Sequence, residues 1–159
     1  MLPPQIGFSA RDSDKDDAVM SKKITSAKNY HKPINYFKDF QEWPQNWMVI
    51  DEDLKVGKSL LALFEPFIDT LIKKGLSVKI IKNHMANLTM LGGEIIRRLN
   101  DGDEKNRKLA PRKLLLEYIE DEYGPLVHHW DPNDSTEQAY QKSFDATCRR
   151  LHKFVTASN

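Results

Sequence analysis

Apolar side chains recur every three or four residues along four stretches of the chain, which is the spacing of one face of an α-helix. The first predicted helix spans about 52 to 74, and Gly75 follows it as a stop signal. Because Pro66 lies inside this run and lacks a backbone donor, we expect a kink or a break into two pieces near Leu63. Its apolar face is Leu60, Leu61, Phe64, Phe67, Ile68 and Leu71.

The second predicted helix spans about 78 to 100, and Ser77 is well placed as its N-cap. Its apolar face is Ile80, Ile81, His84, Leu88, Leu91, Ile95 and Leu99. Gly92 and Gly93 lie in its middle, where each costs roughly 1 kcal/mol relative to alanine. The pair therefore indicates a close approach of another backbone or a bend of the helix, and a larger residue at Gly92 should destabilise the fold.

Two shorter patterns follow. Pro111 suits the first turn of a helix over about 111 to 122, with Leu115, Tyr118 and Ile119 facing inward. The stretch "DSTEQ" then gives a capping-box start to a helix that ends near 155. Its inward face is Tyr140, Phe144, Cys148, Leu151 and Val155.

No strand pattern of comparable length appears, so the predicted fold is all-α, a compact bundle of four to five helices. Residues 1–33 are polar and proline-containing, which predicts a flexible tail, and residues 34–157 form a single helical domain. Residues 34–50 concentrate aromatic side chains. We interpret them as an irregular arm whose rings fill gaps in the core, with a docking segment for a partner as the alternative.

Composition adds few constraints. The 159 residues include 24 Lys plus Arg and 23 Asp plus Glu, so the net charge of +1 gives no global attraction to nucleic acid or membrane. A single cysteine, Cys148, excludes an internal disulfide and favours a reducing compartment. Because no apolar run approaches the roughly 20 residues that span a bilayer, we expect a cytoplasmic protein that does not enter membranes.

Residues 64 to 91, "FEPFIDTLIKKGLSVKIIKNHMANLTML", carry a resemblance to a known family. The apolar helix, the turn Gly75, Leu76 and Ser77, and the later Leu88 and Leu91 resemble the SAM-like core-binding domain of tyrosine recombinases and phage integrases. Ile80 and His84 depart from the family pattern, which has threonine and tyrosine there. The resemblance implies a DNA clamp of mobile-element or phage origin, without the family's catalytic domain.

A DNA-binding role needs cations on an exposed face. Around the predicted turn the candidates are Lys73, Lys74, Ser77, Lys79, Lys82 and Asn83. A second basic group is Arg97, Arg98, Lys105, Arg107, Lys108, Arg112 and Lys113, and a third is Arg149, Arg150, His152 and Lys153. Each group could equally be an ordinary solvated face. Our first hypothesis is a non-enzymatic module that binds duplex DNA or a protein–DNA complex.

The second hypothesis is an adaptor or inhibitor that docks on a larger enzyme or self-associates. Its motivation is the near-zero net charge and three tryptophans, Trp43, Trp47 and Trp130, because tryptophan is favoured at binding hot spots. A protein partner would then replace DNA.

Other candidate chemistry is weaker. His128, His129 and Asp131 could ligate a metal, but adjacent histidines in a loop tend to point apart, so we expect no metal site and no cofactor. Cys148 falls on a buried face, where a thiol is usually inert, and His84 fits a core or boundary position. Since no catalytic set is recognisable, we expect no enzymatic activity.

Overall fold

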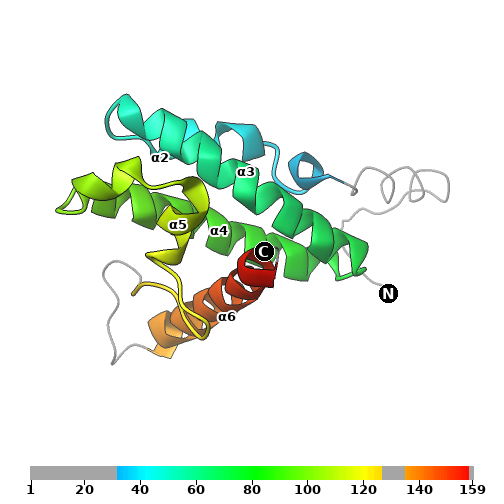
Figure 1. Cartoon of the computed structure of the whole chain (residues 1–159). Coiled ribbons are helices and arrows are strands. Elements are labelled where there is room, and N and C mark those ends of the chain that lie inside the picture. Colours follow the sequence, from blue (N-terminus) through cyan, green and yellow to red (C-terminus); the bar gives the residue numbers. More distant parts are fainter. Residues whose placement is uncertain (1–31, 127–134, 158–159) are drawn as a thin grey trace, which may run out of the picture.

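A computed structural model of the chain describes residues 32–126 and 135–157. The predicted all-α fold is confirmed, because the described residues form a packed helical bundle and contain no strand (Figure 1). The predicted tail falls outside them except for Lys32 and Pro33. The elements are η1 (Pro33–Asn35), η2 (Phe40–Glu42), α2 (Trp43–Trp47), α3 (Glu52–Lys73), α4 (Val78–Leu99), η3 (Glu104–Lys108), α5 (Pro111–Leu116) and α6 (Ser135–Ala157).

Helices α3 and α4 form the central pair of the bundle. Each has 22 residues, and a short turn joins them, so they run antiparallel with their apolar faces together. The short α2 packs against both, α5 lies against α3, and α6 crosses α4 (Figure 1). The core therefore lies between α3 and α4 and is closed by α6 on one side.

Helix α3 continues through Pro66 as one element, so the predicted break near Leu63 was wrong. Proline removes the hydrogen bond to the carbonyl four residues earlier, which here belongs to Ala62. Both Ala62 and Pro66 are exposed, so water can satisfy that carbonyl. The proline thus lies on the solvent face, where it costs the helix least.

Most of the predicted core positions are buried, including Leu60, Phe64, Leu88 and Leu91 at 0% exposure. Two predicted inward positions are corrected. Ile80 is 44% exposed and Tyr140 is 61% exposed, since each lies near the start of its helix. An apolar position at a helix end faces inward only where a neighbouring element extends over it, which periodicity cannot report.

The third predicted helix is shorter than expected. Helix α5 ends at Leu116 rather than 122, although Tyr118 and Ile119 are buried as predicted. Beyond the helix, the amide of Glu120 donates to the carbonyl of Tyr123 at 2.9 Å, a bond that runs in the direction opposite to a helical one. Burial of these two side chains therefore comes from a turn that folds back on the bundle.

The aromatic arm fills the core as interpreted. Phe40 and Trp43 are 0% and 2% exposed and meet edge to face, with ring centroids 4.9 Å apart. The Trp47 indole is half-buried and its Nε1–H donates to the Thr89 carbonyl of α4 at 2.8 Å. Because these rings and α2 cover α3 and α4, the arm is part of the domain's own packing.

The glycines in α4 accommodate this arm. A Cβ at Gly92 would overlap the six-membered ring of Trp47, whereas a Cβ at Gly93 would lie 3.5 Å from the same indole, an ordinary contact. On α3, a Cβ at Gly57 would lie 2.9 Å from the Pro44 Cβ. The predicted close approach at Gly92 is therefore real, but an indole makes it rather than a neighbouring backbone.

A buried carboxylate ties the ends of the central helices together. Asp53 is fully buried and accepts from the amides of Val49 and Ile50 at 3.0 Å, from Asn100 Nδ2 at 2.9 Å and from Arg107 Nε at 3.2 Å. Burial alone would raise the Asp53 pKa, but these four donors outweigh it and hold the pKa below its ordinary value. The network joins α3, the end of α4 and η3.

Candidate nucleic-acid interface

The turn between α3 and α4 has the predicted chemistry. Gly75 adopts φ +76°, a left-handed conformation that glycine takes without a Cβ clash, and it ends α3. Ser77 Oγ accepts from the Ile80 amide at 3.2 Å, so the predicted N-cap is confirmed. The turn therefore presents the first amides of α4 at one end of the bundle.

The six residues proposed for DNA contact are all exposed and lie at this end. Lys73 and Lys74 follow each other at the end of α3, Ser77 caps α4, and Lys79, Lys82 and Asn83 lie in its first two turns. The structure thus brings them to one end of the molecule. Of the six, Lys74 also lines a groove that the end of α3 forms with α6.

That site is a groove of about 590 Å³ between the end of α3 and the last turns of α6. Four cations line it: Lys74 from α3, with Arg149, Arg150 and Lys153 from α6. We call it the cationic groove. The rest of its lining is Phe67, Thr70, Leu71 and Phe154, so it contains no carboxylate. The sequence names Lys74 and the α6 cations as separate groups, and only the fold joins them.

None of these four cations forms an ion pair within residues 32–126 and 135–157. Arg149 Nη1 donates to the Glu122 carbonyl at 3.0 Å, which orients the guanidinium without neutralising it. The Arg150 charge also reaches His84. Burial lowers the His84 pKa, and the Arg150 charge lowers it by a smaller amount. The cationic groove therefore keeps its positive charge.

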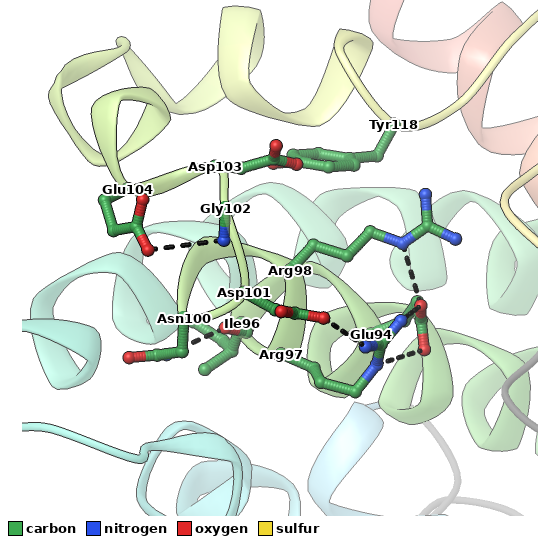
Figure 2. A network of polar contacts seen from close by, with 10 residues as sticks. All are labelled: Glu94, Ile96, Arg97, Arg98, Asn100, Asp101, Gly102, Asp103, Glu104 and Tyr118. Carbon is green, nitrogen blue, oxygen red and sulfur yellow. Dashed lines mark hydrogen bonds and ion pairs between the residues drawn. The ribbon is translucent and has the colours of Figure 1, made fainter.

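The second basic group behaves differently. Glu94 is 8% exposed and accepts from Arg97 Nη2 at 2.5 Å and from Arg98 Nε at 2.8 Å (Figure 2). Burial alone would raise the Glu94 pKa. The hydrogen bonds from the two arginines, together with their charges, lower the pKa by a larger amount, so the Glu94 pKa lies below its ordinary value. Both arginines are thus occupied by one carboxylate.

The loop that follows α4 is held by further polar contacts. Arg97 also contacts Asp101 at 3.5 Å, and the Tyr118 hydroxyl donates to Asp103 at 2.9 Å (Figure 2). Arg107 of the same basic group is held by Asp53. These three arginines therefore stabilise the fold and are less available to phosphate than the cations of the cationic groove.

The tryptophans proposed as partner contacts need correction. Trp43 is 2% exposed and cannot reach a partner without unfolding the arm, while the Trp47 ring lies against Gly92 and its Nε1–H is used by Thr89. The Trp43 and Trp47 rings pack within this domain, and this packing accounts for the two tryptophans without a protein partner. Trp130 lies outside the described residues.

Of the remaining candidates, the structure describes His84 and Cys148. His84 Nδ1 lies 2.8 Å from Thr147 Oγ1, which agrees with the predicted boundary position. Cys148 is fully buried, and burial raises its pKa far above the ordinary value, so the thiol is unreactive. The described residues contain no metal-ligand cluster, and His128, His129 and Asp131 lie outside them. No helix among the described residues is both long and apolar enough to cross a bilayer.

Comparison of the chain with protein-family models, with curated proteins and with solved structures finds no match. The resemblance of residues 64 to 91 to integrase core-binding domains therefore stays a prediction. Sequence reasoning missed the cationic groove because its walls are about 75 residues apart in the chain. The signal available was a doublet, Arg149 and Arg150, on the exposed side of a helix whose other face is apolar.

Proposed function

We propose that this protein is a non-enzymatic module that binds DNA, alone or within a protein–DNA complex, through the cationic groove and the neighbouring turn between α3 and α4. The observation that carries the proposal is the set of four groove cations that lack carboxylate partners in the described chain. Phosphate neutralisation by such cations supplies most of the affinity of sequence-independent DNA binding.

The contrast with Arg97, Arg98 and Arg107 supports this assignment. Those three arginines pair with Glu94 and Asp53, so their charges serve the fold. Four cations that have no carboxylate partner among the described residues repel one another around one groove, and a bound polyanion would relieve this repulsion. The integrase-like turn, a mobile-element or phage-related origin and a cytoplasmic location are consistent parts of the same proposal.

A titration of labelled duplex DNA at several salt concentrations tests it. Binding should weaken with salt, and replacing Lys74 and Arg150 by glutamine should reduce the slope of log affinity against log salt by about 0.9 for each phosphate contact removed. Replacing Lys79 and Lys82 by glutamine should act in the same direction. The matched control replaces Lys105 and Lys113, two exposed lysines at the other end of α4 and on α5.

Two results would overturn the proposal. One is a wild-type protein that shows no salt-dependent binding even at low ionic strength. The other is a control pair whose loss of affinity equals that of the Lys74 and Arg150 pair, since the groove would then contribute no more than general charge.

A protein-interaction role is the second candidate. Leu126 and Tyr140 are 59% and 61% exposed, and Gln141 Nε2 donates to the Pro125 carbonyl at 3.1 Å, which holds these two segments together. Exposed apolar side chains of this kind can contact a partner. Recovery of one stoichiometric protein partner, lost on Tyr140→Ala but kept on replacement of Lys74 and Arg150, would favour this role over DNA binding.

A further inference from the structure

His84 connects the two helices that carry the cations assigned to DNA. On α4 it directly follows Lys82 and Asn83 of the proposed contact set. Across the helix interface its Nδ1 lies 2.8 Å from Thr147 Oγ1 of α6, and Arg150, which lines the cationic groove, comes one helical turn after Thr147. The half-buried imidazole therefore joins the helix of the turn lysines to the helix of the groove arginines.

The hydrogen bonds around His84 can hold the imidazole with one ring proton or with two. Thr147 Oγ1 has one proton to donate and two lone pairs. It accepts from Asn87 Nδ2 at 2.8 Å, and beside a neutral imidazole its own proton can go to His84 Nδ1. Beside an imidazolium, Oγ1 accepts from His84 Nδ1 as well, and its proton turns to the Ser143 carbonyl, 3.4 Å away. Protonation of His84 therefore leaves Thr147 and Asn87 hydrogen-bonded.

The charge that opposes this second proton belongs to the groove. Among the described residues, Arg150 is the charged group that acts on His84, whereas Thr147 and Asn87 beside it are neutral. Burial and, after it, the Arg150 charge lower the His84 pKa. A phosphate bound at Arg150 would offset that positive charge and so favour protonation of the imidazole. By reciprocity, a proton on His84 strengthens the binding of the phosphate.

We propose that His84 is a further member of the DNA-binding surface, which takes up a proton from solvent when a phosphate binds at Arg150 and so makes DNA binding tighter in mild acid. This inference rests on the DNA-binding role proposed above and adds its regulation by pH. Duplex phosphates keep their charge over the range in which histidine titrates, so this change arises in the protein.

Fluorescence anisotropy with a labelled blunt duplex at constant salt tests the inference. Other histidines of the chain also gain charge in acid, so the measured quantity is the gain in affinity from about pH 7.5 to pH 5.5, compared between the wild type and His84→Gln. The wild-type gain should be about fivefold larger, the lower end of typical couplings between sites. The matched control is His152→Gln, which removes a histidine of α6 that does not line the groove and should keep the full gain.

The outcomes separate this inference from the DNA-binding role. A wild type that binds no duplex at either pH overturns the DNA-binding role itself. Duplex binding in which His84→Gln keeps the whole gain, or in which His152→Gln loses as much of it as His84→Gln, overturns this inference alone. If His84→Gln does not fold, an NMR titration of the wild type decides, because bound duplex should raise the pKa of the His84 ring. A His84 pKa that the duplex leaves unchanged or lowers would overturn the inference.

Discussion

At the residue scale, two adjacent glycines in α4 differ in how closely a neighbouring side chain approaches them. Gly92 gives the Trp47 ring a place to lie, and Gly93 borders the same indole without being overlapped by it. Trp47 in turn donates to the Thr89 carbonyl one turn earlier. The helix therefore accepts a propensity cost at both positions, but only Gly92 is required by contact with a neighbour.

Alanine at each glycine tests this difference. Gly92→Ala should destabilise the fold by about 2 kcal/mol, because an added Cβ forces the indole out of a packed site. Gly93→Ala is the matched control and should stabilise the fold by about 0.5–1 kcal/mol through helix propensity. Urea unfolding monitored by circular dichroism measures both, and Gly92→Leu should cost more than Gly92→Ala. Equal effects at the two positions would show that Trp47 does not rest on Gly92.

At the element scale, α4 and α6 are joined by a small polar cluster rather than by apolar contacts alone. Asn87 Nδ2 donates to Thr147 Oγ1 at 2.8 Å and to Ser143 Oγ at 3.1 Å, and His84 Nδ1 contacts Thr147 Oγ1 at 2.8 Å. Such a cluster fixes the register of the two helices, because a shift along either axis would leave buried groups without partners.

This interface should make stability depend on pH. Burial, and after it the Arg150 charge, lowers the His84 pKa below the ordinary value of 6.5. The unfolded chain therefore binds the proton more readily than the native protein does. The stability contributed by neutral His84 is fully present above pH 6.5 and is lost as the pH falls from there through the native pKa. Charged groups facing His84 include Arg150, which opposes protonation.

His84→Gln, which cannot titrate, tests this dependence. The difference in unfolding free energy between the wild type and the variant should shrink between about pH 7 and pH 5. Urea unfolding at both pH values measures the difference, and an NMR titration of the His84 ring should give a pKa below 6.5. A difference that stays constant across this range would mean that His84 keeps its unfolded pKa in the native protein.

At the scale of the whole molecule, the near-zero net charge of +1 conceals an uneven distribution. Carboxylates pair with arginines at the end of α4 and around Asp53, while the opposite end of the bundle gathers Lys74, Arg149, Arg150 and Lys153 without such partners in the described chain. Local excess of one sign attracts an oppositely charged ligand and repels itself.

That repulsion predicts that removing a groove cation raises the stability of the fold and weakens DNA binding. Arg150→Gln should raise the unfolding free energy by about 0.5 kcal/mol at low salt, with the gain vanishing at high salt, while it weakens DNA binding. Thermal unfolding at two salt concentrations measures the effect, with Lys113→Gln as the control cation away from the groove. A loss of stability in Arg150→Gln would instead assign Arg150 a structural role.

The sequence by itself determined the helices, the turn and most of the core. Periodicity located α3, α4 and α6, and Gly75 and Ser77 marked the corner between the first two, because these signals are local to one or two turns of chain. The same local signals gave wrong predictions at Pro66, Ile80 and Tyr140. At these positions, helix continuity or burial depends on whether that face of the helix meets solvent or a neighbouring element.

Only the tertiary structure decided which charges are available and which residues meet. Glu94 and Asp53 pair with three arginines of one basic group, and Lys74 lines one groove with Arg149 and Arg150, which are about 75 residues away in the chain. The physical reason is that electrostatic partners are chosen by distance in space, whereas a sequence gives separation along the chain. The contact between the Trp47 ring and Gly92 is likewise a matter of distance in space. A glycine within a helix indicates a close neighbour, but only the structure identifies that neighbour as Trp47.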